Sequence, residues 1–217
     1  LIKNPDVNLQ DNDGVTALMI AAAKGDKNIV KRLLKNGAKV DIQNKDRLTA
    51  LMIACTNGHE ETVQLLIEKK QDLNIQSKGS DRSKRIKDGD TALMIACKTG
   101  IKEIVSLLLE KGAKVDLQDI QGSTALMIAV TKGNEEVLRL FKNGNKEIVS
   151  LLLEKGAEVD HQDNDGTTAL MIACAIDNEQ IVRLLCEKTR NINLQDNEGH
   201  TALMIAAAKG DKNIVKR

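Results

Sequence analysis

The sequence Thr-Ala-Leu-Met-Ile-Ala occurs six times in the chain, at residues 16–21, 49–54, 91–96, 124–129, 168–173 and 201–206. Successive copies begin 33, 42, 33, 44 and 33 residues apart. A fixed period of this length is typical of a repeat protein, in which each copy forms one small structural unit. The two longer intervals therefore indicate insertions into a unit of 33 residues.

The first copy predicts the structure of the unit. Residues 11–14, Asp-Asn-Asp-Gly, are of the types that favour a tight turn. Thr16 is a suitable N-cap for a helix over residues 17–24, which is followed by a glycine. Asp26 can cap a second helix over residues 27–36, whose apolar residues have helical spacing. Neither short helix could bury its apolar face alone, so we expect the copies to stack on one another.

This unit resembles the ankyrin repeat. The resemblance rests on Gly-x-Thr-Ala-Leu-Met-Ile-Ala and on Glu-Ile-Val-x-Leu-Leu-Leu-Glu-Lys-Gly-Ala-x-Val-Asp at residues 103–116, and it covers the chain apart from the insertions. It implies an all-α repeat solenoid, an ankyrin-like array of helix-turn-helix units with β-hairpin or finger loops. The chain departs from the family's usual Thr-Pro-Leu-His, which is Thr-Ala-Leu-Met in every copy, and Arg47 and Asp177 stand where a turn glycine is usual.

The repeat register predicts a single array over residues 1–217. Residues 7–32 and 192–217 differ at only three positions, and neither end resembles a polar capping repeat. We therefore expect a fragment of a longer array, and end-to-end self-association of such an uncapped fragment. The predicted units are residues 11–43, 44–76, 86–118, 119–162, 163–195 and the incomplete 196–217, with a finger insertion at 77–87 and a second insertion at 134–144.

The finger insertion is basic. Residues 78–88 contain five Lys or Arg and two Asp. One interpretation is a tolerated, mobile surface loop, since insertions at loop tips cost little. The other is a contact for an acidic partner surface. Lys84 and Arg85 also leave nuclear entry open, although short basic clusters are common.

The second insertion contains four apolar residues, including Phe141, the single aromatic residue of the chain. We expect an extra helical turn or two that stops at residues 143–144, Asn-Gly, with a fresh second helix over residues 145–155. The insertion is interpreted either as structural padding or as a hydrophobic contact.

Composition excludes several classes of partner. The net charge is +1 and the chain has no Trp or Tyr, so it lacks both the basic field and the stacking platforms that favour nucleic acid. The longest apolar runs have seven residues, whereas a membrane-spanning helix needs about 20. We therefore expect no nucleic-acid and no membrane partner, and a cytoplasmic protein.

Catalytic and metal-binding motifs are also missing from the sequence. Cys55, Cys97 and Cys174 fall at the position of a core alanine of the first helix and Cys186 falls at a leucine position, so all four are interpreted as core residues. His59 is placed at the start of a second helix, where a polar side chain can cap. We expect no cofactor, no metal and no enzymatic activity.

The ankyrin resemblance implies a protein partner of unknown identity, bound at the fingertips and at the exposed ends of the first helices. Val15, Leu48, Ile120 and Ile176 are apolar at such positions and are the predicted anchors. By repeat register and from the basic insertion, the partner-binding candidates are Asn12, Asp13, Val15, Lys24, Lys45, Asp46, Leu48, Asn57, Arg82, Lys84, Arg85, Lys87, Asp90, Lys98, Ile120, Gln121, Ser123, Lys132, Asn164, Asp165, Thr167 and Ile176.

Two functional hypotheses follow. The first is a non-enzymatic protein–protein interaction scaffold that binds through its concave face and its finger loops. The alternative is a targeting or regulatory segment of a larger multidomain protein whose activity lies outside these residues.

Overall fold

The computed structural model describes residues 5–79, 86–131 and 142–210, and in residues 142–145 the backbone only. The chain divides into two compact units, Leu1–Ala113 and Lys114–Arg217, which we describe separately. Within the described residues the regular structure is entirely α-helical.

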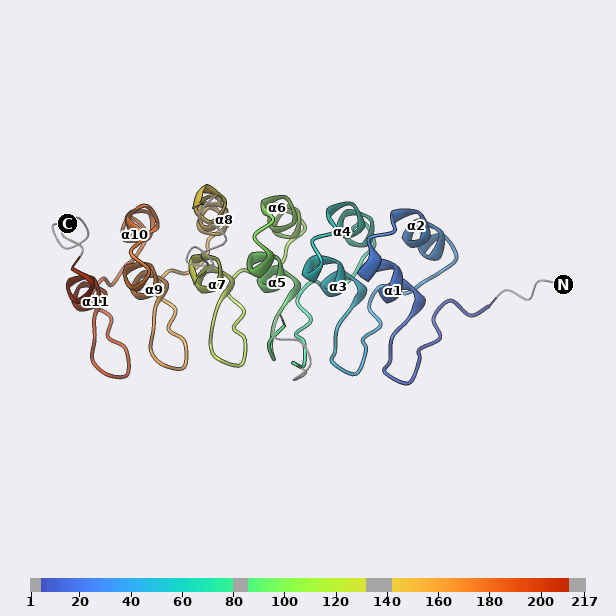
Figure 1. Ribbon diagram of the computed structural model, residues 1–217, viewed down its shortest axis with the longest axis horizontal. Coiled ribbons are helices and arrows are strands. Elements are labelled where there is room, and N and C mark those ends of the chain that lie inside the picture. Colours follow the sequence, from blue (N-terminus) through green and yellow to red (C-terminus); the bar gives the residue numbers. More distant parts are fainter. Residues whose placement is uncertain (1–4, 80–85, 132–141, 211–217) are drawn as a thin grey trace. The chain divides into compact units, whose positions relative to one another are not determined.

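The first unit contains three antiparallel helix pairs. The pairs are α1 (Ala17–Lys24) with α2 (Lys27–Lys35), α3 (Ala50–Thr56) with α4 (Glu60–Ile67), and α5 (Ala92–Thr99) with α6 (Lys102–Glu110). The first helices α1, α3 and α5 stack in one layer, and the second helices α2, α4 and α6 stack in another (Figure 1). Finger loops extend from the first-helix layer, on the side away from the second helices.

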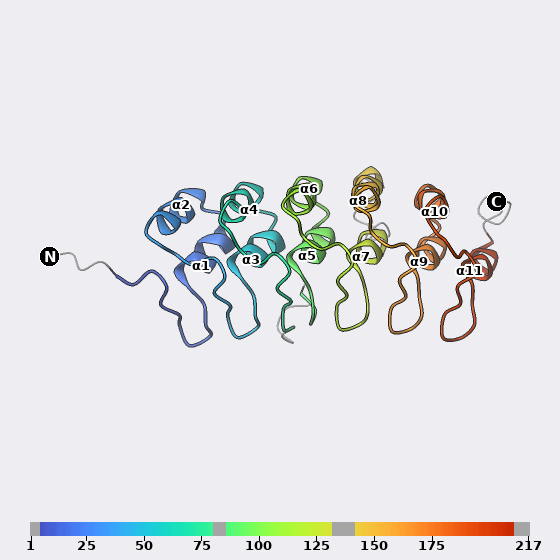
Figure 2. The same ribbon diagram turned by 180° about the vertical axis from the view of Figure 1, so that it is seen from behind.

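The second unit has the same two layers. The first helices are α7 (Ala125–Thr131), α9 (Ala169–Ala175) and α11 (Ala202–Lys209), and the second helices are α8 (Lys142–Glu154) and α10 (Glu179–Cys186). Helix α9 packs between α7 and α11, and α10 packs against α8. Figure 2 shows the fingers from behind, again on the side of the first helices.

The N-caps predicted for the two helices of the first copy are confirmed. Thr16 Oγ1 accepts a hydrogen bond from Met19 N at 3.3 Å, and the threonine of each later copy makes the same bond. Asp26 Oδ1 caps α2 by accepting from two backbone N–H groups at 3.0 Å. Arg47 and Asp177 adopt φ values of 57° and 58°, as expected of residues in a glycine position.

The leucine and methionine of the repeated motif form the core. In the first five copies these two side chains are at most 4% exposed. Burial of each contributes about 1.5–3 kcal/mol, and the neighbouring alanines allow the helices to approach closely. Methionine packing therefore occupies the position at which the family pattern has histidine.

The predicted finger loops are present as tight turns. Among the described residues there are isolated antiparallel bridges, such as Gln10 with Thr16, but no strand. The side chain of Asp11 holds the first finger by accepting from Asp13 N at 2.9 Å and Val15 N at 2.8 Å. Because a side chain closes each turn, a ladder of backbone bonds is not needed.

Three further predictions need correction. Helix α8 begins at Lys142 and so runs through the Asn-Gly at 143–144, where a helix stop was expected, since one glycine costs a helix only about 1 kcal/mol. Cys186 is exposed at the end of α10 and is not a core residue. The side chain of His59 does not cap α4, because its Nε2 lies 3.0 Å from Ala23 O of the preceding repeat. Residues 134–141 of the second insertion lie outside the described residues.

Candidate functional site

The fingers of the first unit are joined to one another by hydrogen bonds. Gln10 Nε2 donates to Gly14 O of its own finger at 2.7 Å and to Gln43 O of the next repeat at 3.0 Å. Near the tips, Lys45 N donates to Asp13 O at 3.0 Å. These bonds fix the spacing of adjacent fingertips, so their outward side chains form a preorganised surface.

The second unit repeats this arrangement. Asn164 N donates to Gln121 O at 3.0 Å, and Asn197 N donates to Asp165 O at 3.0 Å. Gly122 lies so close to the next finger that a Cβ atom there would be 2.8 Å from Asn164 N. Its φ of +78° and this close approach both require glycine.

The structure places ten of the predicted partner-binding residues on the exposed surface and seven at half-buried positions. The exposed residues are Asn12, Asp13, Lys24, Lys45, Asn57, Lys87, Ile120, Gln121, Asn164 and Asp165. The half-buried residues are Val15, Asp46, Leu48, Lys98, Ser123, Thr167 and Ile176. Arg82, Lys84, Arg85 and Lys132 lie outside the described residues.

Among the four predicted apolar anchors, Ile120 alone is fully exposed, at 63%. Val15, Leu48 and Ile176 are half-buried, because they lie at the base of a finger or beside the end of a helix rather than at a tip. Ile120 is therefore the one anchor that projects freely, whereas Leu48 contributes to a hollow in the surface.

Asp90 is a buried residue, so the exposure expected from its fingertip position is corrected by the structure. Its side chain is 0% exposed, and its carboxylate accepts from Lys98 Nζ, at 2.6 Å for Oδ1, and from Lys87 N. The physical reason lies in the insertion, because Ser77 stands where other fingers have the turn-forming Asp or Asn. Asp90 lies at the register position of Val15, on the other side of the loop from Ser77, and it supplies a carboxylate to the finger from there.

The base of the third finger keeps the geometry of the other fingers despite the insertion. Ser77 N donates to Asp90 O and Gly89 N donates to Ser77 O, both at 2.9 Å. Ser77 Oγ also donates to Lys87 O at 2.7 Å. The insertion therefore extends from an unchanged base, and it does not disturb the stacking of α3 on α5.

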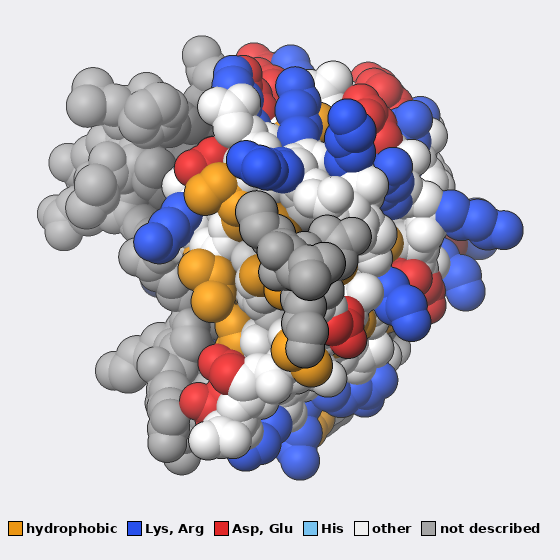
Figure 3. Space-filling model, turned by 90° about the vertical axis from the view of Figure 1, so that its right-hand side faces the viewer, with side chains coloured by type: hydrophobic (Ala, Val, Ile, Leu, Met, Phe, Trp, Pro, Cys, Tyr) orange, Lys and Arg blue, Asp and Glu red, His pale blue; other side chains and the backbone are white. Residues whose placement is uncertain are grey.

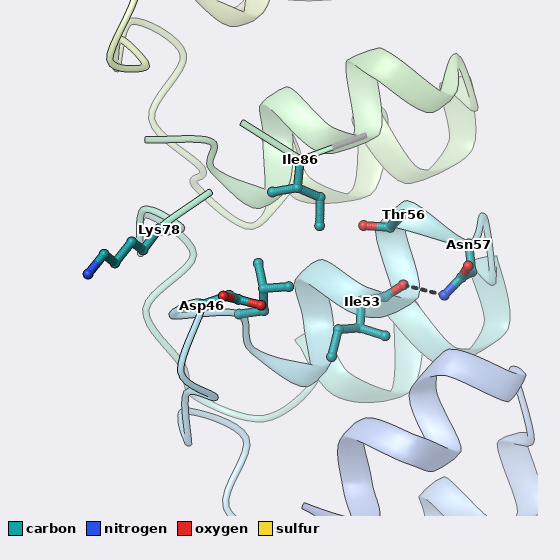
Figure 4. A pocket seen from close by; sticks show the side chains of 7 residues that line it. Asp46, Ile53, Thr56, Asn57, Lys78 and Ile86 are labelled. Carbon is teal, nitrogen blue, oxygen red and sulfur yellow. Dashed lines mark hydrogen bonds between the residues drawn. The ribbon is translucent and has the colours of Figure 1, made fainter. Parts of the chain in front are cut away.

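A hollow of about 180 Å³ opens between the second and third fingers of the first unit, beside α3 (Figure 4). Its lining joins the predicted residues Asp46, Leu48 and Asn57 to residues that the sequence analysis did not select as partner contacts. These are Ile53, Thr56, Lys78 and Ile86. The one signal in the sequence was Ile86, an apolar residue within an otherwise polar insertion.

A shallower, open hollow of about 490 Å³ lies near the ends of α2 and α4, in the second-helix layer. Its lining residues are Leu34, Ala38, Lys39, Val40, Asp41, Ile42, Lys69 and Lys70.

Apolar side chains are also exposed at the end of the first unit formed by α1 and α2. Leu9, Ile20 and Ile29 are 69%, 50% and 49% exposed, whereas Ile95, at the register position of Ile20, is 1% exposed. Figure 3 views this end and shows hydrophobic side chains in its middle with Lys and Arg around them. In α5 the side chain of Ile95 is covered by packing, whereas Ile20 of α1 is not. End-to-end self-association through the exposed face of α1 remains a prediction.

In the finger of residues 196–200, the pKa of the Asp196 side chain is clearly shifted. The N–H groups of His200 and Glu198 donate to Asp196 Oδ1 at 2.8 and 3.0 Å. These bonds, the bond from His200 foremost, hold the pKa of the Asp196 carboxyl below its usual value. His200 Nδ1 also lies 3.3 Å from Asp196 Oδ2.

The described residues contain no cluster of His, Cys, Asp and Glu that could hold a metal ion. None of the helices in the described part of the chain is long and apolar enough to cross a membrane.

Stacked helix pairs with fingers on one side define an all-α repeat solenoid. A family model described as ankyrin repeats (3 copies) matches residues 1–77, 73–144 and 141–217, and the chain therefore belongs to the ankyrin repeat family. A comparison with curated proteins gives no match. Ankyrin repeats are generally protein–protein interaction modules that bind other proteins, and their fold is typically non-enzymatic.

Proposed function

We propose that this array is a non-enzymatic scaffold that binds a partner protein through its finger loops and the adjacent ends of its first helices. One contrast carries the proposal. The residues that cap and pack the helices are nearly the same in every copy, while the exposed finger positions differ from copy to copy. The position of Asn12, for example, is taken by Lys45, Ile120 and Asn164 in later fingers.

The finger geometry supports this proposal. Backbone bonds between neighbouring tips, such as Lys45 N to Asp13 O and Asn197 N to Asp165 O, hold the varied side chains at fixed spacing. A surface that is ordered before binding loses little conformational entropy when a partner docks. The surface has no Trp or Tyr, so binding energy must be spread over many modest contacts.

A quantitative affinity capture tests the proposal with two variants of equal charge change. The finger variant carries Lys45→Glu, Ile120→Glu and Asp165→Lys, all at exposed finger positions. We expect the wild-type chain to retain a specific protein from the source cell's lysate, and the finger variant to lose it.

The matched control carries Lys31→Glu, Gln64→Glu and Glu187→Lys, at exposed positions of the second-helix layer. This control should retain the captured protein. Loss of the protein from the control alone would place binding on the second helices and would contradict the proposal. Equal capture by all three chains would also contradict it.

A further inference from the structure

We propose that the hollow between the second and third fingers binds one leucine-sized or phenylalanine-sized side chain from an acidic segment of a partner protein. This inference rests on the proposed function, because it assigns a partner chemistry to one part of the finger surface. It is carried by the size of the hollow, by the chemistry of its walls and by the charge of the two fingers that flank it.

The hollow has the size of a single apolar side chain. Its volume is about 180 Å³. A cavity of about 150 Å³ lined by aliphatic side chains is large enough to bind benzene. One leucine or phenylalanine side chain therefore fits, and the opening to solvent lets the chain that carries it lie across the fingers.

Three of the side chains that line the hollow are apolar. Leu48 and Ile53 are half-buried and Ile86 is 8% exposed. In Figure 4, Ile86 and Ile53 lie on opposite sides of the hollow. An apolar side chain that enters would remove surface from water on itself and on these three residues.

The polar side chains of helix α3 at the hollow are already bonded to their own helix. Thr56 Oγ1 donates to Met52 O at 2.9 Å, and Asn57 Nδ2 donates to Ile53 O at 3.1 Å. The Thr56 hydroxyl and one N–H group of Asn57 are therefore already paired, and the exposed Asn57 keeps the rest of its amide at the surface, so an apolar group can lie against this side of the helix.

The two fingers that flank the hollow differ in charge from all the others. Between the register positions of Asp11 and Val15, residues 44–48 carry a net charge of +1, and the described residues of the third finger, 77–79 and 86–90, carry a net charge of 0. The same segment of the other fingers, at 11–15, 119–123, 163–167 and 196–200, carries −2, −1, −2 and −2. An acidic segment therefore meets a net charge of +1 on this pair of fingers and a negative net charge on each of the remaining four.

Lys78 gives this charge a specific position at the rim. Its side chain is exposed, and its ammonium forms no ion pair with any residue in the described parts of the chain. In Figure 4 it extends away from the hollow, where a carboxylate beside the inserted side chain can reach it. Lys45, in the finger that supplies Asp46 and Leu48, is a further exposed cation, and its 4.0 Å pair with Asp13 of the first finger is solvent-exposed and weak.

Asp46 makes the hollow selective. It lines the hollow and carries a negative charge, so a carboxylate or phosphate is disfavoured inside. The apolar side chain therefore enters, and the acidic groups of the partner remain outside, near the lysines. The same residue, together with the absence of Trp and Tyr for stacking, favours an acidic protein segment over a nucleic acid.

Selection of displayed random peptides on the whole 217-residue chain tests the proposal. We expect enriched peptides to combine an excess of Asp and Glu with one Leu, Ile or Phe. Leu48→Asp places a second carboxylate at the hollow and should weaken their binding about tenfold or more. Lys78→Glu should weaken it several-fold.

Two control variants match these changes. Ile192→Asp introduces the same charge at an exposed apolar position that lies outside the fingers and does not line the hollow, and Lys69→Glu reverses an exposed lysine in the second-helix layer. Both should leave the affinity unchanged, and circular dichroism should show that all four variants are folded. Affinity that falls equally for Ile192→Asp and Leu48→Asp would overturn the proposal.

Other outcomes separate this inference from the proposed function. Binding of peptides without acidic residues would contradict the proposed role of the hollow and would leave the scaffold function unaffected. The same holds if the peptides lose affinity with Ile120→Asp but not with Leu48→Asp. Competition by single-stranded DNA that Leu48→Asp abolishes would assign the site to nucleic acid instead. The proposal would also be overturned if none of the enriched peptides depended on Leu48 for binding. The lysate capture would still test the scaffold function in that case.

Discussion

Lys98 on α5 donates from its ammonium to the buried carboxylate of Asp90, and this contact ties the third finger to its helix. In the first repeat the two register positions hold Val15 and Ala23, which make no such pair. The ion pair therefore accompanies the insertion, and it explains how a lengthened finger keeps the same base as a short one.

We expect Lys98→Ala to lower the free energy of unfolding by about 3–5 kcal/mol, because it removes an ion-pair partner of the buried Asp90 carboxylate. The double variant Asp90→Val with Lys98→Ala restores the residues of the first repeat and should recover most of this loss. Urea unfolding followed by circular dichroism measures both. If the double variant were no more stable than Lys98→Ala, the desolvation argument would be wrong.

Gly122→Ala should destabilise the second unit more than Gly156→Ala does. Both glycines have positive φ, at +78° and +85°, so each substitution costs about 1 kcal/mol in backbone strain. A Cβ at position 122 would also meet Asn164 N at 2.8 Å, whereas nothing lies within 4 Å of one at position 156. Thermal unfolding of the two variants gives the comparison, and equal losses would show that the fingers can separate without cost.

The cysteines should differ in reactivity. Burial raises the pKa of the Cys55 and Cys97 thiols to about 12, so at neutral pH both remain protonated and shielded. Cys186 is exposed at the end of α10. We expect iodoacetamide to label Cys186 first and the two buried thiols only after denaturation, as measured by peptide mass spectrometry. Early labelling of Cys55 in the native chain would contradict the predicted stacking.

The charge of Asp196 should stabilise the last finger in a pH-dependent way. Its pKa is lower in the folded chain than in the unfolded chain, so the stabilisation is complete above the unfolded value and is lost as the pH falls through the folded value. Asp196→Asn keeps the shape of the turn without the charge. It should be less stable than the wild type at pH 6, and the difference should vanish in acid. A difference that grows as the pH falls would reverse the assigned sign.

Local features of the fold could be predicted from the sequence because they depend on neighbours within one repeat. Thr16 precedes an apolar run and caps the helix that this run forms. Arg47 has a positive φ because its position in the turn requires one. The burial of the repeated Leu-Met pair follows from stacking identical units.

The features that could not be predicted depend on contacts between segments distant in the sequence. Asp90 is a fingertip position by register, and its burial depends on Lys98, a lysine where other copies have Ala or Thr. The hollow beside Leu48 requires Ile86 to return from the insertion toward α3. The spacing of residues along the chain does not predict that an inserted segment folds back onto a helix.

Hydrogen–deuterium exchange of the chain with its captured partner tests the central claim most directly. The account predicts slower exchange in the finger segments and at the ends of the first helices, with residues 44–57 prominent among them and α2, α4 and α10 unchanged. Slower exchange confined to the second helices, with the fingers unaffected, would contradict it.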